Sequence, residues 1–410
     1  MGSVQTSAVP PRWVEPWTRG QGDARARALL ARVWDGEPDG VWSAPGRVTI
    51  IGEHTDYNGG MTLPTVTPHR TYVAARLRDD DRVRIVSEGA GRFDGPGDIW
   101  EGTLDGIDPE TAKGWPAYVA GVMWALRERG FDGAGLDIAI CSCVPSDAGL
   151  ASSGALSCAT ARAINALWGL ALDSDQSQWE LAEACVHAEE AIAGVPAGGL
   201  DQHTQLRCRE GEAIELDFSH APPRVLRRPL YFPEYGLALL VIALRSSHQG
   251  RAAGLANRVD ECRAAARALG VARLGDLAGA PGACGRVGAL EDATLRRRAR
   301  HVLSEIDRVH DVMAELANTG PAHERFVHVG EQLFRSHASL EMDFEVSTPE
   351  QNLAVDTAYR TGALGARLIG AGFGGCALAF IRRTQADSMA QRIDHEFIDA
   401  GRERPQFLLL

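Results

Sequence analysis

Hydrogen-bonding side chains crowd into one short segment of the chain. Residues 53–58 read Glu-His-Thr-Asp-Tyr-Asn, directly after the apolar run Val48–Ile51 and before Gly59-Gly60. Carboxylates and an imidazole at this spacing can accept from and donate to neighbouring hydroxyl groups, and the flanking glycines let the backbone approach a ligand closely. A solvated hairpin with an Asn-Gly turn has the same composition. The residue types alone therefore leave two interpretations open, a polyol site and a turn.

A second segment has the chemistry of an anion site. Residues 144–155 read Val-Pro-Ser-Asp-Ala-Gly-Leu-Ala-Ser-Ser-Gly-Ala and join a predicted strand, Leu136–Cys143, to a predicted helix, Ser152–Leu167. Small residues at a helix start expose backbone N–H groups to a phosphate, and the hydroxyls of Ser152 and Ser153 can reach a phosphate or Mg²⁺. Close packing of the helix is the alternative explanation for the small side chains.

The near absence of lysine argues against the common lysine-dependent phosphate sites. Lys113 is the only lysine in the chain. A P-loop requires the pattern GxxxxGK[ST], and both the protein-kinase mechanism and Schiff-base chemistry require a lysine in the site. The chain has no P-loop, whereas backbone N–H groups at a helix start can bind phosphate without a lysine.

Two further segments place glycines beside side chains that can do chemistry. Residues 194–202 read Gly-Val-Pro-Ala-Gly-Gly-Leu-Asp-Gln, which puts Asp201 directly after a flexible turn. Residues 368–376 read Leu-Ile-Gly-Ala-Gly-Phe-Gly-Gly-Cys and follow Gly365-Ala-Arg. Read alone, the aspartate is explained as a helix cap and the glycines as a tight turn between a strand and a helix.

Hydrophobic periodicity predicts the elements that must position these residues. We expect an arm at residues 1–40, loosely docked and with a short helix at Ala24–Val33, and then a strand pair at Val41–Gly52 broken at Pro45-Gly46. Further strands are expected at Thr71–Arg78, Val83–Ser87, Leu136–Cys143, Ala213–Phe218, Leu237–Leu244 and Ala377–Ile381. Helices are expected at Trp115–Arg129, Ser152–Leu167, Gln178–Ala193, Ala252–Leu269 and Leu295–Leu316.

In their order along the chain and in their residue sequence, these segments resemble galactokinases, within the wider family of GHMP small-molecule kinases. Residues 46–60 match the galactokinase signature almost letter for letter, residues 144–155 fit the family's phosphate-binding loop, and residues 365–376 fit its C-terminal motif. The resemblance extends from about residue 40 to about residue 385. It implies an α+β fold of two domains, at residues 1–200 and 201–410, with the active site in the cleft between them.

The resemblance also implies roles for individual residues. Asp201 is expected to face the anomeric hydroxyl of a sugar and accept its proton, while Arg47 pairs with it and stabilises the charge of the transferred phosphoryl group. The other expected contacts are Glu53, His54, Asp56 and Gly198 for the sugar, Gly149, Ser152, Ser153, Trp115 and Tyr118 for ATP, and Ser153 and Glu189 for Mg²⁺. A solvated helix surface for Glu189, and core packing for the two aromatic residues, are the alternatives.

The chain departs from the galactokinase pattern in two places. Asp147 and Ala151 stand where the family usually has Gly and Ser, and a carboxylate beside a polyphosphate weakens binding unless Mg²⁺ or an arginine offsets it. Leu255 stands where the family has a tyrosine that hydrogen-bonds the sugar. The same segment contains side chains that can meet a second anion, namely Arg245, His248 and Arg251.

Two substrates are compatible with this departure. An enlarged pocket with a second anion site, to which Arg245 and His248 contribute, predicts a longer sugar of galactose configuration, such as a heptose or octose that already carries a phosphate, in a secondary-metabolite pathway. A divergent galactokinase with a compensating contact predicts galactose itself. We favour ATP-dependent phosphorylation of C1 of the longer sugar, with ordinary galactokinase as the alternative and a non-catalytic sensor of sugar and ATP as a third hypothesis.

Length and charge limit the other classes of function. The chain has 410 residues, a net charge of −12 and a pI near 5.5. This balance argues against a broad surface for nucleic acid or anionic membrane, and no apolar run is long enough to predict a membrane span. Eight scattered cysteines are typical of reduced thiols in a cytoplasmic protein. We expect a cytoplasmic enzyme that is a monomer or a weak homodimer.

Overall fold

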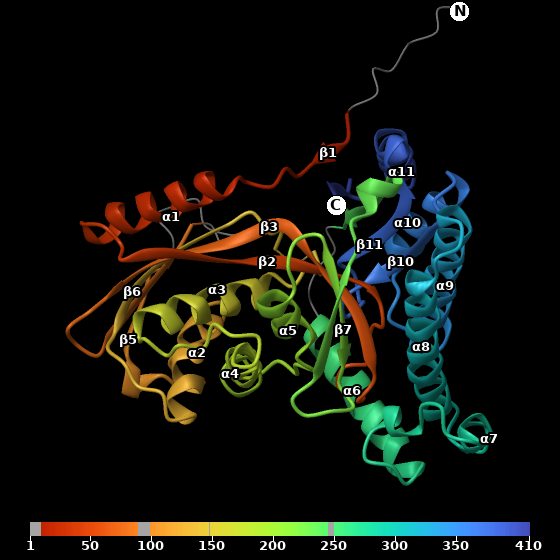
Figure 1. The fold of residues 1–410 in the computed structure, drawn as a ribbon, viewed down its shortest axis with the longest axis horizontal. Helices are drawn as coiled ribbons and strands as arrows, with labels where there is room; N and C mark the ends of the chain where they lie inside the picture. Colours follow the sequence, from red (N-terminus) through yellow and green to blue (C-terminus); the bar gives the residue numbers. More distant parts are fainter. Residues whose placement is uncertain (1–9, 89–98, 147, 245–249) are drawn as a thin grey trace, which may run out of the picture.

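Two β-sheets, each packed between helices, make up the protein (Figure 1). The structure is a computed structural model that describes residues 10–88, 99–146, 148–244 and 250–410. Among these residues no helix is both long enough and apolar enough to cross a membrane.

The first sheet is built mostly by the N-terminal half of the chain. Its strand order is β5-β4-β6-β3-β7-β8, with β2 also paired to β3, and the contact between β4 and β6 is parallel while the other pairs are antiparallel. The strands are β2 (Gly40–Ile51), β3 (Met61–Leu77), β4 (Arg82–Ser87), β5 (Ile99–Thr103), β6 (Leu136–Ser142), β7 (Glu212–Asp217) and β8 (Arg224–Pro229).

Helices cover both faces of this sheet because its strands are apolar on both sides. Val73, Ile138 and their neighbours pack against one group of helices, and Tyr72 and Ala139, which point the other way, pack under α1 (Arg19–Trp34). Figure 1 shows α1 on one side of the sheet and the group of four on the other. That group is α2 (Ala117–Glu128), α3 (Ser152–Leu167), α4 (Gln178–Ala191) and α5 (Leu200–Arg207).

The second sheet joins the two ends of the described chain. Its order is β1-β12-β9-β11-β10, and β1 runs parallel to β12. Its strands are β1 (Arg12–Trp13), β9 (Leu237–Ala243), β10 (Gly365–Ile369), β11 (Cys376–Arg382) and β12 (Gln406–Leu409). Its helices are α6 (Arg251–Ala268), α7 (Ala283–Gly288), α8 (Ala293–Ala317), α9 (Ala322–Met342), α10 (Pro349–Arg360) and α11 (Ala386–Asp399), with short 3₁₀ turns at Phe232–Tyr235, Leu274–Leu277 and Arg383–Gln385. A further 3₁₀ turn, Leu104–Gly106, follows β5 and packs in the core of the first sheet.

Most of the expected elements are confirmed, and two expectations are wrong in detail. Residues 40–51 form one continuous strand, because the register shift between Pro45 and Arg47 is a β-bulge and not a break between two strands. The helix near the N-terminus is firmly packed instead of loosely docked, since Ala26, Leu29 and Leu30 are buried against the sheet. The periodicity of residues 24–33 had shown the helix but not the surface that covers it.

Sheet membership suggests a different division of the chain from residue 200. α5, β7 and β8 belong to the first sheet, and the second sheet resumes at Leu237. The strand at Arg12–Trp13 belongs to the second sheet although it precedes the first in sequence. We therefore propose a boundary between Pro229 and Leu237, with the N-terminal strand assigned to the C-terminal unit.

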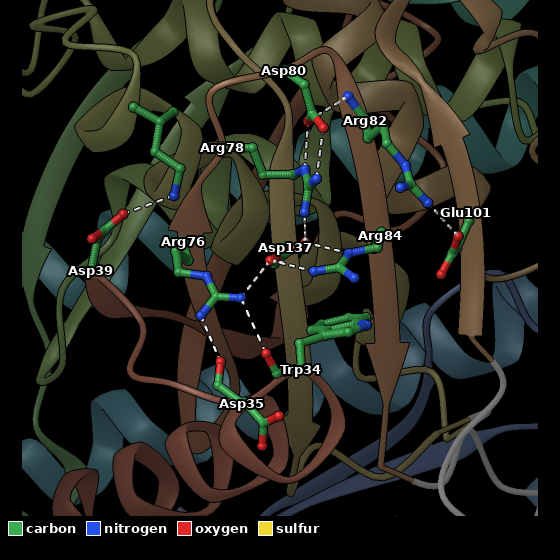
Figure 2. Close-up of polar contacts among 11 residues, drawn as sticks. Trp34, Asp35, Asp39, Arg76, Arg78, Asp80, Arg82, Arg84, Glu101 and Asp137 are labelled. Carbon is green, nitrogen blue, oxygen red and sulfur yellow. Dashed lines mark hydrogen bonds and ion pairs between the residues drawn. The ribbon is translucent and has the colours of Figure 1, made fainter.

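A buried carboxylate ties three strands of the first sheet together beside the C-terminal end of α1. Asp137 on β6 is 1% exposed and accepts hydrogen bonds from Arg76, Arg78 and Arg84 at 2.7–3.0 Å (Figure 2). Arg78 also donates to Asp80 at 2.6 and 2.7 Å. This cluster positions no residue of the candidate site, and its effect is on stability.

Candidate active site

Arg47 and Asp201 meet as the resemblance implied. Arg47 Nε donates to Asp201 Oδ1 at 2.6 Å, and its Nη1 donates to the carbonyl of Gly149 at 3.2 Å. Burial disfavours the charged guanidinium, but Asp201 and Glu53 outweigh it and raise the pKa of Arg47. A permanent positive charge therefore lies between Asp201 and the loop that precedes α3.

Local backbone geometry explains how the two side chains reach each other. The bulge at Gly46 lets the chain approach the loop before α3, and a β-carbon there would lie 2.8 Å from the Thr67 hydroxyl. The N–H of Arg47 donates to the carbonyl of Leu150 at 2.9 Å, which fixes the loop against β2. Gly199, with φ of 93°, begins α5, so Asp201 lies in the first turn of a helix, where a carboxylate is stabilised.

Besides Arg47, four side chains of residues 46–60, the sugar signature, line the same cavity as Asp201, namely Glu53, His54, Asp56 and Tyr57. Asp56 is packed against Gly198, where an added β-carbon would lie 2.0 Å from its Oδ2, and burial raises the pKa of Asp56 to about 6. Burial lowers the pKa of His54, so its ring is neutral. Its Nδ1 is 2.9 Å from the Tyr57 hydroxyl, and its Nε2 has no hydrogen-bond partner among the described residues.

Glu53 is a deeply buried member of the signature. Its side chain is 3% exposed, and its Oε1 accepts from the N–H of Gly370 at 2.8 Å and lies 3.3 Å from Arg367 Nη2. Burial raises the pKa of Glu53 although Arg367 and Arg47 act to lower it. Gly370 belongs to the glycine-rich segment 368–376, so that segment contacts the sugar signature directly.

The start of α3 has the form of an anion site. Gly149 and Ala151 have φ of 71° and 56°, which turns the chain into the helix, and Ser152 and Ser153 line the cavity at its first turn. Within the described chain the helix start receives no hydrogen bond from a capping side chain. Its first N–H groups and the helix dipole therefore face the cavity, which favours a phosphate.

Glu189 on α4 has the chemistry expected of a Mg²⁺ ligand. It is 7% exposed, and burial together with the neighbouring carboxylate of Asp201 raises its pKa to about 8. A buried carboxylate beside a second carboxylate is relieved by a cation, and Mg²⁺ commonly binds one or two carboxylates plus phosphate oxygens. The described residues hold no group of three or more acidic, histidine or cysteine side chains that could bind a metal ion.

Each sheet together with its helices forms one lobe of the protein. Both lobes contribute to the wall of the cavity, which has a volume of about 950 Å³. Trp115 and Tyr118 line it, as does the expected sugar edge at Leu255 on α6. Gly254 packs α6 onto Phe373, since a β-carbon there would lie 2.8 Å from the Phe373 ring. The cavity thus contains every expected site residue that the structure describes. Arg245, His248 and Asp147 lie outside the described residues.

Family comparisons agree with this geometry. The galactokinase galactose-binding signature matches residues 31–77, the N-terminal domain of GHMP kinases matches residues 117–208, and their C-terminal domain matches residues 313–399. A galactokinase of Streptomyces coelicolor is 39% identical over 376 residues, which is 91% of this chain and 92% of the relative. The chain belongs to the galactokinase family. A Streptomyces lividans galactokinase is 36% identical, with 96% of this chain and 92% of the relative covered.

Solved structures place this galactokinase-family fold among known ones. A Lactococcus lactis galactokinase complexed with galactose superposes with a TM-score of 0.84 at 27% identity, covering 94% of this chain and 97% of that one. A mevalonate kinase of Methanococcus jannaschii gives a TM-score of 0.62 at 18% identity, covering 91% and 98%, and shares the fold. The prediction of a two-domain α+β GHMP kinase fold is confirmed, and the chain is a galactokinase-type sugar kinase.

Two buried residues of this galactokinase-family site were missed by sequence reasoning. Arg367 was read only as part of a glycine-rich motif, and Glu305 was read as one position on a predicted helix. Each contacts the residues around the end of β2, more than 250 positions earlier. A charged residue inside an apolar strand, as Arg367 is between Ala366 and Leu368, was the one available signal.

Proposed function

We propose that this protein transfers the γ-phosphoryl group of ATP to the anomeric hydroxyl of galactose. The observation that carries the proposal is the Arg47–Asp201 pair, which lies between the sugar signature and the start of α3. A donor phosphate at the helix start and a sugar against Asp56 and His54 would meet at this pair. The galactokinase relatives and the galactose-bound neighbour support galactose as the acceptor.

The proposed mechanism depends on positioning and charge more than on a strong base. Asp201 accepts the proton of the anomeric hydroxyl, and Arg47 holds the carboxylate in place and stabilises charge on the transferred group. The neutral ring of His54 offers its Nε2 to a sugar hydroxyl, and Asp56 accepts from another. The N–H groups at the start of α3 hold the phosphates of ATP.

Ser153 and Glu189 would hold Mg²⁺ together with phosphate oxygens of ATP. The metal, when bound, supplies positive charge that neutralises the phosphates during transfer. Within the protein, Glu189 accepts a hydrogen bond from Gln202, which follows Asp201 directly and so ties the metal ligand to the helix that carries the base. Trp115 and Tyr118 are proposed to contact the nucleotide.

A longer sugar of galactose configuration is a second candidate substrate. Leu255 supports it, because an apolar side chain lines the cavity where the family's tyrosine would bond a hydroxyl, and Arg251 and Arg263 line the cavity beside it. The sequence favoured this longer sugar, a heptose or octose with a phosphate on its tail, but the galactokinase relatives support galactose, so the longer sugar becomes the second candidate.

Product analysis tests both candidates. The enzyme is incubated with ATP, Mg²⁺ and either galactose or a heptose of the same configuration with and without a terminal phosphate, and the products are identified by ³¹P NMR and mass spectrometry. Efficient formation of galactose 1-phosphate supports the main proposal. Turnover restricted to the longer sugars would replace it with the second candidate.

The Asp201→Asn enzyme tests the mechanism and separates a kinase from a sensor. The amide cannot accept the proton, so turnover should fall about 10²- to 10⁴-fold while galactose binding persists. Asp175→Asn is the matched control, because Asp175 also pairs with an arginine, Arg227, but lies on the surface. Absence of ADP release from the unmodified protein with every sugar would support a sensor instead. We further propose that the protein acts in the cytoplasm as a monomer or weak homodimer.

A further inference from the structure

The end of β2 and the sugar signature are held by the opposite lobe of the protein. Side chains on α8 and β10 bond to residues 49–53 across separations of 248 to 318 positions in sequence. These contacts reach both the backbone and the side chain of the signature. The placement of Glu53 therefore depends on residues that lie far from it in the chain.

Arg367 makes the central contact of this group. It lies on β10, is 0% exposed, and its Nη1 donates to the carbonyls of Ile50 at 3.0 Å and Thr49 at 3.4 Å. Its Nη2 lies 3.3 Å from Glu53 Oε1. One guanidinium thus joins the last residues of β2 to the carboxylate that follows the strand.

Glu305 and His301 on α8 contact the backbone of Gly52 and Glu53, just after the end of β2. Glu305 Oε1 accepts from the N–H of Gly52 at 3.0 Å and from the hydroxyl of Ser336 at 2.8 Å. Burial acts to raise the pKa of Glu305, but Arg308 and Arg367 lower it to about 2, so this carboxylate is charged. His301 Nε2 lies 3.3 Å from the carbonyl of Glu53.

Arg367 contacts the site without entering it. Among the described residues, Glu53 and Gly370 line the cavity and Arg367 does not. A buried ion pair adds little net stability over apolar packing, because removing two charges from water costs about as much as their attraction returns. A planar guanidinium can bond to two carbonyls and a carboxylate at once, which a lysine cannot do. Geometry, more than stability, explains an arginine at this position.

We propose that Arg367 is a positioning residue for the sugar site, which fixes Glu53 and the end of β2 at the cavity wall. The inference rests on the proposed sugar kinase activity. It predicts that loss of Arg367 weakens sugar binding selectively, because among the described residues its side chain bonds to Thr49, Ile50 and Glu53 and not to the start of α3.

A double-mutant cycle tests this role. The variants Arg367→Met, Glu53→Gln and the double variant are compared with the unmodified enzyme for the KM of galactose, the KM of ATP and galactose affinity by calorimetry. Arg367→Met should raise the KM of galactose about 10- to 100-fold and leave the KM of ATP unchanged. If Arg367 acts through Glu53, the double variant should be no worse than the more impaired single variant.

Two further variants keep the test decisive. Arg367→Lys retains the charge but cannot reach both the β2 carbonyls and Glu53, so its galactose KM should lie between those of the unmodified enzyme and Arg367→Met. If Arg367→Met does not fold, Arg367→Lys takes its place in the test. Arg404→Met is the matched control, since Arg404 pairs with the buried Asp394 away from the cavity, and both KM values should be unchanged.

The outcomes separate the two proposals. An unmodified enzyme that phosphorylates no sugar overturns the proposed function itself. An active enzyme in which Arg367→Met, or Arg367→Lys in its place, changes both KM values equally overturns the positioning role. The positioning role is also overturned if the increases in galactose KM caused by the single Arg367 and Glu53 variants multiply in the double variant.

Discussion

Gly198 and Asp56 face each other at the cavity wall with no room for another atom. A β-carbon on residue 198 would lie 2.0 Å from Asp56 Oδ2 and 3.0 Å from the backbone nitrogen of Tyr57. In Gly198→Ala the carboxylate must therefore move away from the sugar, and we expect the KM of galactose to rise about tenfold. The KM of ATP should be unchanged in the same steady-state assay.

The control for this variant is a glycine with free space around it. An added β-carbon at Gly285, on α7, meets nothing within 4 Å, so Gly285→Ala should leave both KM values as they are. An unchanged galactose KM in Gly198→Ala would show that Asp56 does not bind the sugar.

At the residue scale, the sequence predicts which residues line the cavity where a short motif determines the local backbone geometry. Arg47, Asp56 and Ser153 line one cavity because three glycine-rich segments converge on it, and the family resemblance supplied their order. Glu305 and Arg367 could not be found in this way, because their contacts depend on how α8 and β10 pack against β2. Glu305 stands three residues after Val302 and four before Val309, on the apolar face of α8, but this pattern does not reveal what covers that face.

At the element scale, prediction followed the strength of the local signal. α3 begins and ends at the predicted residues, Ser152 and Leu167, because small and apolar side chains give it a clear helical period. The helix also begins with Ala151 in the left-handed region, which the sequence does not reveal. The sequence predicts a break where β2 has a bulge, since Pro45-Gly46 is typical of a turn as well as of a bulge.

The three-arginine cluster on β3, β4 and β6 predicts a large effect on stability. In Asp137→Asn, three guanidinium groups lose the buried carboxylate that they share (Figure 2). We expect the free energy of unfolding at pH 7 to fall by about 3 kcal/mol, as for other broken buried pairs. Urea unfolding measures it. Asp105→Asn is the control, because Asp105 pairs with Arg127 at the surface and should contribute less than about 1 kcal/mol.

The same cluster predicts how the difference in unfolding free energy between the unmodified protein and Asp137→Asn depends on pH. Burial acts to raise the pKa of Asp137, but Arg84, Arg76 and Arg78 outweigh it and lower the pKa. A carboxyl group with a lowered folded-state pKa stabilises the fold above its unfolded pKa of about 3.9 and loses this effect as the pH falls through the folded value. The gap between unmodified protein and Asp137→Asn should therefore be constant from pH 7 to about 5 and shrink below about pH 4. A gap that grows in acid would contradict the assignment.

At the scale of the whole molecule, the two sheets share one apolar cluster. Val48 and Ile50 of β2 pack in the same cluster as Val241 of β9, Val309 of α8 and Leu378 of β11. The contacts of Arg367 and Glu305 with the end of β2 cross the same junction. The resemblance predicted two domains with a site between them, but the sequence could not reveal this shared cluster, because hydrophobic periodicity reports which face of an element is buried but not what buries it.

A shared core predicts that the lobes unfold together although the chain is long enough for two independent domains. We expect scanning calorimetry to show a single transition whose calorimetric and van't Hoff enthalpies agree. Galactose at about 100 times its dissociation constant should stabilise the whole molecule by about 2.7 kcal/mol and move that transition as a unit. Val122→Ala in the first lobe and Val309→Ala at the junction each remove buried methyl groups, so each should lower the one transition. If Val122→Ala instead lowered one of two transitions and left the other in place, the lobes would be separate folding units, and the residues that hold the sugar signature would join two bodies that are each stable alone.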